Sequence, residues 1–445
     1  MKNLKFALKA LFAVFAAAML LNGCIMVGAP KNNVEDITLA IMKELISPYR
    51  GEQSPAAGAA AKGANDFAFR LSAALLKDGG NKNFICSPLS VWLPLAALVN
   101  ATDSNSKAVL FSAIGAAGLN EDDLNGAASR MLYSLTNEQG KEYAAESGKE
   151  HHNPVKIVNA VFVDKNLTLR QEFAQTFVDF YRGSSIKVDF SSQEAVESVN
   201  KWAMDSTDGL IDNIIERFEP ETAAAIANAI YFSDRWNSEF DPGETEEGIF
   251  KSPGGDANAF YMLREGEQPY YEDDKIQAVP LKFKTDGGMC VILPKDGDAA
   301  GLLTSMTGEY FDKIINDSAN SDGKLLLPRF SIESDVIKLD DALVSLGVPL
   351  FDAMAAPLTG GLIKENVPVW VGEALQKAAI NVDEKGTTAA AVTMVVTYFA
   401  IIPEPAKTFE MKCDRPFVFI LYGGAYGGDF GRQILFTGIV NEPAS

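Results

Sequence analysis

Histidine is the scarcest chemically useful residue type in this chain. The 445 residues include only His151 and His152, adjacent in a polar stretch before Pro154. Neither has a glutamate or a second histidine at the spacing of a zinc motif. The Gly-x-Ser-x-Gly turn of many hydrolases and the Walker phosphate loop are also missing. We therefore expect no metal site and no cofactor, with a hydrolase as the enzyme alternative.

A single Ser-x-x-Lys pattern, from Ser198 to Lys201, is the nearest approach to a nucleophile motif. The partner motifs of enzymes that use it are absent. The pattern also falls in the middle of an expected helix, so we interpret it as a chance occurrence. Carboxylates are abundant, with 59 aspartates and glutamates, so a pair of them carries no information about catalysis.

Cysteine and positive charge are both in short supply. Cys86, Cys290 and Cys413 lie in apolar contexts and are odd in number, which predicts buried thiols rather than a disulfide framework. The net charge is −20 and the pI is about 4.6. This charge disfavours a nucleic-acid or heparin-type partner and favours solubility.

Long hydrophobic runs are limited to the N-terminus. Three lysines precede an apolar run from Ala10 to Leu21, which is too short for a comfortable membrane span. The pattern is typical of a secretory signal peptide over residues 1–23. It ends in Leu21-Asn-Gly-Cys24, which resembles a bacterial lipobox, although Asn22 is unusual there. We predict lipidation of Cys24; the alternative is a soluble secreted protein with a stray cysteine.

The predicted location follows from that cysteine. Acyl chains on Cys24 would anchor the protein, so we expect an exported, membrane-anchored bacterial lipoprotein at the cell envelope or cell surface. Ile25 follows the cysteine. In a Gram-negative host this resembles a lipoprotein sent to the outer membrane.

Residues 24–64 are expected to form a tether that begins with the lipidated cysteine. Asp36 to Tyr49 has the apolar spacing of a short amphipathic helix, and Gly51 to Gly63 has the composition of a flexible linker. Residues 65–445 follow without an internal repeat or a second low-complexity break. Their interleaved helix and strand patterns are compatible with one large domain.

Several elements of that domain can be predicted from pattern alone. We expect helices and strands in alternation, with a central strand in the almost uncharged run Thr222–Phe232. The expected helices are 65–77, 88–98, 170–181 and 193–206, and the expected strands are 155–163, 186–190, 222–232, 417–422 and 433–440. Ser87 is expected to cap the second helix. The Gly-rich stretch 423–431 is interpreted as a hairpin connection.

The segment from Thr387 to Phe399 is unusual for its place in the chain. Nearly every residue is small, β-branched or aromatic, with no charge and no proline, which is strand composition. A charged turn, Asp383–Gly386, precedes it, and the charged, proline-broken stretch Pro403–Lys407 follows. Taken alone, the segment could be an ordinary buried strand.

Four ordered motifs give this segment a different interpretation. They resemble signatures of the serpins, inhibitors of serine proteases, over about Asn65 to Pro443. The motifs are Asn83–Ser90, Asn228–Trp236, the hinge that begins at Asp383, and Met411–Leu421. The resemblance implies an α+β fold (multi-domain class), the serpin fold, with about eight to nine helices around three β-sheets and an exposed reactive-centre loop.

The resemblance also implies a mechanism, in which a protease cuts the exposed loop and the loop inserts into a sheet as a new strand. Serpin loop insertion is a recognised case of strand addition and of released strain. The implied hinge residues are Glu384, Gly386, Thr387, Thr388, Ala389, Ala390 and Ala391. Family spacing puts the scissile bond between Ala400 and Ile401, with Tyr398 and Phe399 as alternatives if the register shifts.

The residues themselves show that this loop is able to insert. It has no proline to break a ladder, and alternate residues from Thr387 onward carry no charge, so they can face a packed interior. Gly386 and the following alanines give a flexible start. Thr388 stands where a glutamate is often seen, and Val392 where a fourth alanine is usual; both are strand formers. In the uncut protein we expect the hinge to lie near the surface.

Six further positions match serpin residues that act where the sheet parts or where the loop first enters it. By resemblance these shutter and breach residues are Ser87, Ser90, Asn228, Trp236, Arg329 and Gln376. Gln376 stands where animal serpins often have a histidine, and its amide offers both a donor and an acceptor. Arg329 matches a basic residue that pairs with the glutamate matched by Glu384.

The sequence therefore favours an inhibitory serpin that traps serine proteases as covalent acyl-enzymes, with papain-like cysteine proteases as an additional target class. The alternative is a non-inhibitory serpin-fold binding protein or a decoy substrate. Elastase-like or chymotrypsin-like targets are favoured, and trypsin-like enzymes are disfavoured because no lysine or arginine lies between Lys385 and Lys407. We expect a monomer with no nucleic-acid partner.

Overall fold

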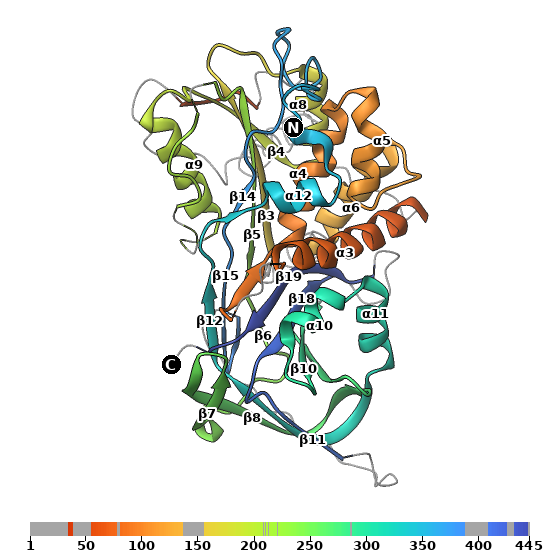
Figure 1. The fold of residues 1–445 in the computed structure, drawn as a ribbon, viewed down its shortest axis with the longest axis vertical. Coiled ribbons are helices and arrows are strands. Elements are labelled where there is room, and N and C mark those ends of the chain that lie inside the picture. Colours follow the sequence, from red (N-terminus) through yellow and green to blue (C-terminus); the bar gives the residue numbers. More distant parts are fainter. Residues whose placement is uncertain are drawn as a thin grey trace, which may run out of the picture.

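A computed structural model gives the structure of the chain for residues 34–38, 55–77, 81–136, 155–207, 209, 211, 213–219, 221–284, 287–387, 408–424 and 431–443. Helices and strands are interleaved along the chain (Figure 1). The helices of this part are α3 (Pro55–Leu75), α4 (Pro88–Leu98), α5 (Ser104–Ala113), α6 (Glu121–Leu135), α8 (Gln171–Tyr181), α9 (Gln193–Ser206), α10 (Ala299–Ser305), α11 (Gly308–Asp317) and α12 (Asp340–Ser345).

Local sequence explains where several of these helices begin. The side chain of Asp103 accepts hydrogen bonds from the backbone N–H groups of Asn105 and Ser106 and so caps α5. Asn120 caps α6, whose first turn is acidic and complements the positive end of the helix dipole. The predicted helices at 88–98, 170–181 and 193–206 are confirmed as α4, α8 and α9.

A four-stranded sheet carries α9 on one face and the other N-terminal helices on the opposite face (Figure 1). Its strands, in spatial order, are β1 (Val34–Asp36), β4 (Gly183–Val188), β3 (Val155–Asp164) and β5 (Ala224–Phe232). Alternation along β3 supplies both faces, because Phe162 packs in the cluster beneath α9 while Val161 and Val163 join the main core. The predicted strand at 155–163 is confirmed.

A second four-stranded sheet continues the first one. It consists of β12 (Phe330–Glu333), β15 (Ala379–Asp383), β16 (Gly386–Thr387) and β6 (Asp234–Arg235), in that order. A short pair, β13 (Ile337–Lys338) with β14 (Leu375–Gln376), continues the β12–β15 pair, because the backbone N–H of Ser334 donates to the carbonyl of Ala378 at 2.8 Å between them. Within the described residues, no hydrogen-bonded ladder joins β5 to β15. The run Thr222–Phe232 therefore forms a strand as predicted, but it lies at the edge of its ladder rather than at the centre.

The largest sheet lies at the other end of the molecule (Figure 1). Its spatial order is β17-β11-β8-β9-β10-β18-β19-β2, with β7 paired to β8. The strands are β2 (Phe84–Cys86), β7 (Glu246–Ser252), β8 (Gly255–Glu272), β9 (Ile276–Lys282), β10 (Gly287–Pro294), β11 (Ala319–Pro328), β17 (Thr408–Lys412), β18 (Phe417–Gly423) and β19 (Gln433–Val440). β18 and β19 pair antiparallel, which confirms the predicted hairpin.

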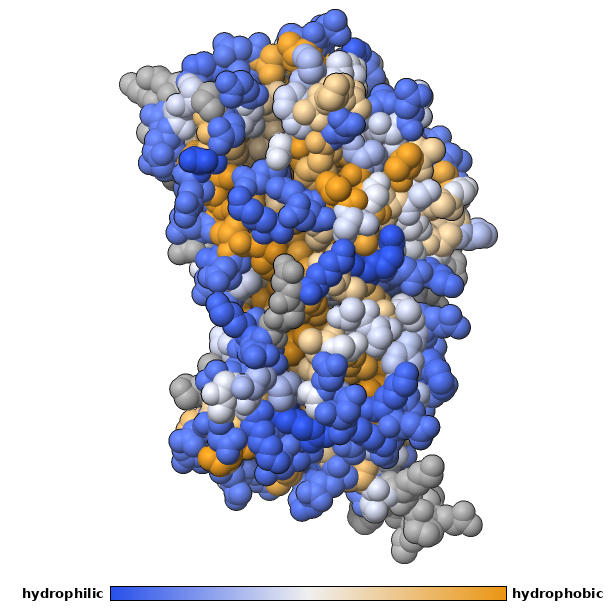
Figure 2. All heavy atoms as spheres, viewed as in Figure 1, coloured by the Kyte–Doolittle hydropathy of each residue, from blue (hydrophilic) through white to orange (hydrophobic). Residues whose placement is uncertain are grey.

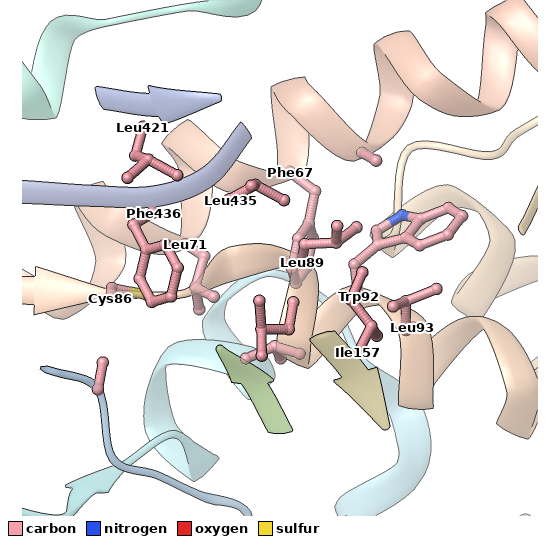
Figure 3. Packing of buried hydrophobic residues seen from close by; sticks show 14 of the residues in the cluster. Phe67, Leu71, Cys86, Leu89, Trp92, Leu93, Ile157, Leu421, Leu435 and Phe436 are labelled. Carbon is pink, nitrogen blue, oxygen red and sulfur yellow. The ribbon is translucent and has the colours of Figure 1, made fainter. Parts of the chain in front are cut away.

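One main core runs between the sheets and the helices. Figure 3 shows side chains of α3 and α4, among them Phe67, Leu71 and Trp92, packed close to Leu435 and Phe436 of β19. The indole N–H of Trp92 donates to the carbonyl of Ile114 at 2.9 Å, so the one polar atom of this buried ring is satisfied. In Figure 2 the end that carries β7 and β11 is mainly hydrophilic.

Three expectations for the first half of the chain need correction. The linker predicted over Gly51–Gly63 is wrong in its second part, because α3 begins at Pro55 and buries Ala57, Ala60 and Ala61. Asp36 belongs to strand β1 rather than to a helix, and residues 39–54 lie outside the described part. Ser87 precedes α4, but its side chain makes no capping bond.

The predicted class of fold is confirmed: an α+β arrangement with nine α-helices in the described residues. The strands of this part form four hydrogen-bonded sets rather than the three expected sheets. They are the two halves of a main sheet that is divided between β5 and β15, the largest sheet, and the short pair β13–β14, which continues β12–β15. No described helix combines the length and the hydropathy needed to cross a bilayer.

Candidate functional site

The candidate site is the place where the two halves of the divided sheet approach each other. β16 lies between β15 and β6 and pairs antiparallel with both: Thr387 is opposite Val382 on one side and Asp234 on the other. The hydroxyl of Thr387 accepts from the backbone N–H of Asp234 at 3.2 Å and lies 3.4 Å from its carbonyl. Thr387 is 1% exposed. The expectation of a surface hinge is therefore wrong at this residue.

The turn before β16 is fixed by one aspartate and one glycine. The carboxylate of Asp383 accepts hydrogen bonds from the backbone N–H groups of Lys385 at 2.8 Å and Gly386 at 3.2 Å. Gly386 has φ +147°, and a Cβ added there would lie 2.1 Å from the carbonyl oxygen of Asp234. Glycine is thus required here by both conformation and space.

Trp236 is buried directly behind this turn. Its indole N–H donates to the carbonyl of Asp383 at 2.9 Å, and its backbone N–H donates to the carbonyl of Lys385 at 2.9 Å. The ring stacks on Phe283 with centroids 4.7 Å apart. Both bonds hold the residues that lead into Thr387, which is the place that the sequence predicted for this tryptophan.

An ion pair holds the same turn from the other side. Arg329 donates through Nε to Glu384 at 2.7 Å, with a second guanidinium contact at 2.5 Å, and the hydroxyl of Thr245 donates at 2.6 Å. The predicted contact of Arg329 with Glu384 is therefore present. Burial by itself raises the pKa of Glu384, but the bonds from Arg329 and Thr245 outweigh it, so the pKa lies below its ordinary value.

Gln376 forms a closed hydrogen-bond network farther along the sheet. Its Nε2 donates to the carbonyl of Ser87 and to Oγ of Ser90, each at 2.7 Å, and its Oε1 accepts from the backbone N–H of Ser87 at 3.0 Å. The hydroxyl of Ser87 donates to the carbonyl of Leu435 at 2.9 Å, which explains why it does not cap α4. The network ties β14 to the start of α4 and to β19.

Asn228 does not join that network. Its amide donates to Oδ1 of Asn159 at 2.8 Å, and Asn159 in turn donates to the carbonyl of Tyr181 at 2.6 Å. The Oδ1 of Asn228 is buried without a partner in the described part of the chain. Asn228 thus ties β5 to β3 through Asn159, across the ladder in which the two residues are opposite each other.

The remaining predicted residues lie outside the described part. These are Thr388, Ala389, Ala390, Ala391, Tyr398, Phe399, Ala400, Ile401 and Cys24. Sequence reasoning also missed Asp234, Thr245 and Asn159, which bond directly to predicted site residues. Asp234 lies within the motif Asn228–Trp236, whereas Thr245 and Asn159 lie outside the four motifs. The role of each depends on its place opposite a partner in the fold.

The described residues contain no group of three or more metal-ligating side chains. The hydroxyl of Ser198 donates to the carbonyl of Glu194 within α9, while Lys201 pairs with Asp205, so the Ser-x-x-Lys residues do not contact each other. Cys86, Cys290 and Cys413 are buried free thiols, as predicted, and burial raises the pKa of each.

Comparisons with known proteins agree with this architecture. An uncharacterised serpin-like protein of Thermococcus kodakarensis is 30% identical over 402 residues, covering 88% of this chain and 87% of that protein. The plasma serine protease inhibitor of Bos taurus is 27% identical, covering 88% and 93%. The native structure of the thermophilic serpin tengpin matches with a TM-score of 0.77 at 24% identity, covering 92% of this chain and all of that one.

The sequence model described as "Serpin (serine protease inhibitor)" matches residues 62–443. The match includes the divided sheet, the Trp236 and Arg329 contacts and the Gln376 network. The chain is a member of the serpin family.

Proposed function

We propose that this protein is an inhibitory serpin, which traps a protease as a covalent acyl-enzyme when its cut loop inserts between β5 and β15. The observation that carries the proposal is the position of Thr387, already paired between β15 and β6. In the same register, the residues after Thr387 would continue from Asp234 toward Ala224, along the edge of β5 that has no ladder partner in the described residues. The strand-forming composition of 387–399 suits that path.

The free energy that insertion along this path would release is large enough to drive it. About a dozen inserted residues at ~1 kcal/mol for each ladder bond, with apolar burial in addition, yield more than ~10 kcal/mol before entropy. This is on the scale of the total stability of a domain. The uncut form would therefore be held by a kinetic barrier, and cleavage would release it.

The protease class follows from the scissile region. We place the cut between Ala400 and Ile401, where a small residue suits elastase-like enzymes, with Tyr398 or Phe399 offering a chymotrypsin-like site. The test is incubation with elastase, chymotrypsin, trypsin and papain, followed by denaturing gels and mass spectrometry of the released fragment. We expect a gel-stable complex with elastase or chymotrypsin. Clean cleavage without any complex would identify a decoy substrate or binding protein instead.

We also propose that Cys24 is acylated and anchors the protein to a membrane. The lipobox-like Leu21-Asn-Gly-Cys24 supports this. The test is the intact mass of the protein purified from membranes of a bacterial host that processes lipoproteins, compared with a Cys24→Ser variant. A mature mass that begins at Cys24 with added acyl chains is expected, and a water-soluble chain of unmodified mass would contradict it.

A further inference from the structure

The segment just after the proposed anchor is part of the sheet. β1 pairs antiparallel with β4, with Val34 opposite Val188 and Asp36 opposite Ile186. The backbone N–H of Ile37 donates to the carbonyl of Ser185 at 3.0 Å. Ile37 is 7% exposed and joins the main core, while Val34 packs on the other face in the cluster beneath α9. The segment is therefore docked by strand pairing and by burial on both faces.

The side chain of Thr38 fixes the end of β1 by two hydrogen bonds. The hydroxyl of Thr38 accepts from the backbone N–H of Ser185 at 2.9 Å and donates to Oδ1 of Asp36 at 2.6 Å. Thr38 is 7% exposed, so these bonds are shielded from water. The docking is specific to one register, because a shift by one residue would turn Ile37 away from the core.

The strand registers place β1 at the end of the molecule opposite the reactive loop. Val34 of β1 pairs with Val188 of β4, and Val188 pairs with Asp164 of β3. Asp164 follows Val163, which pairs with Ala224 at the first end of β5, so Val34 lies at that end of the sheet. Thr387, where the loop begins, is level with Asp234 beyond the other end of β5. Eleven residues of strand separate the two levels, about 35 Å. The chain enters β1 at Val34, its outermost residue. Figure 1 shows β4 near one end and β11, next to the strand after the loop, near the other.

From these observations we propose that β1 orients the anchored inhibitor, holding the β1 end toward the bilayer and the reactive loop toward the aqueous phase. Cys24 precedes Val34 by ten residues, so the acylated cysteine lies at most about 35 Å from the β1 end. The partner class this fits is a soluble protease that arrives from solution, and not one whose active site lies at the same bilayer surface. This orientation rests on the proposed lipid anchor, and the choice of partner rests on the proposed inhibition.

The test measures fluorescence energy transfer from a donor dye on the protein, attached at one of two positions, to an acceptor dye on the lipid. The lipidated chain carries one new cysteine, either Glu221→Cys near the β1 end or Asp322→Cys opposite Thr408 beside the loop; both positions are exposed. The native cysteines of the domain are buried. Each protein is inserted in phosphatidylethanolamine/phosphatidylglycerol vesicles with a rhodamine headgroup acceptor. We expect transfer from position 221 to exceed that from position 322 several-fold.

Matched variants show whether β1 is the cause. Ile37→Asp should release the strand and remove the difference between the two labels, while Glu35→Gln, an exposed change in the same strand, should keep it. If Ile37→Asp fails to fold, Thr38→Val removes the acceptor of Ser185 and serves in its place. Equal transfer from both labels, a difference that survives release of β1, or failure to stay on the vesicles overturns the proposal.

The measurement needs no protease, so it stands apart from the test of inhibition. A chain that inhibits proteases in solution but shows no orientation refutes the orientation alone. A chain that is oriented but never forms a covalent complex refutes the proposed inhibition and leaves the orientation standing.

Discussion

Replacing Gln376 with leucine tests the hydrogen-bond network beside the divided sheet. Gln376 is 6% exposed, and its amide makes three bonds, two to Ser87 and one to Ser90. Leucine has a similar volume but can make none of them. The backbone N–H of Ser87 would lose its acceptor in a buried place, which costs more than the loss of an exposed bond.

The magnitude follows from the three bonds. At about 1 kcal/mol each, Gln376→Leu should lower the free energy of unfolding by roughly 3 kcal/mol. For a domain of this size this corresponds to a fall in Tm of roughly 4 °C. Because the network ties β14 to α4, we also expect faster loss of inhibitory activity on warm incubation of the uncut protein.

The assay is thermal melting followed by circular dichroism, with Gln193→Leu as the matched control. Gln193 is exposed at the start of α9, so the same chemical change there should alter stability by no more than about 0.5 kcal/mol. A Tm for Gln376→Leu equal to that of the wild type would refute the importance assigned to the network.

Three further predictions concern the turn that leads into the loop. Gly386→Ala should destabilise by about 3 kcal/mol or more, because of its positive φ and the clash with Asp234, whereas Gly254→Ala, in open space, should be near neutral in the same melting assay. The pKa of Glu384 is lowered in the folded protein, so its ion pair contributes stability above the ordinary pKa of 4.5, and this stability is lost as pH falls through the folded-state pKa. In a plot of Tm against pH, Glu384→Gln should therefore reduce the fall of Tm at acid pH. An unchanged fall would contradict this role of Glu384. Thr387→Arg should lower the Tm of the uncut protein by burying an unpaired guanidinium, and a wild-type melting curve would show that Thr387 is not inserted before cleavage.

Much of the fold could be predicted from local pattern. The helix at 193–206 and the strand at 433–440 match the structure at both ends, because a regular apolar period continues up to a clear polar boundary. The start of α3 was missed, since an alanine- and glycine-rich run has the composition of a linker. Ala57, Ala60 and Ala61 are buried there by tertiary packing, which local composition does not report.

The site was accessible only where a family motif marks a residue. Arg329 and Glu384 are far apart in sequence, and their contact was expected because both match one motif pair. The burial of Thr387 could not be foreseen, because it depends on Asp234 of β6 lying opposite. The separation of Asn228 from the Gln376 network likewise depends on Asn159 being its neighbour across the ladder. Such long-range pairings are set by sheet register rather than by composition.

The most direct test of loop insertion is the melting temperature of the protein before and after cleavage within residues 388–407. Insertion of the cut loop between β5 and β15 would complete the divided sheet, so the cleaved protein should melt tens of degrees above the intact one. Superimposable melting curves for the cut and uncut protein would contradict the account.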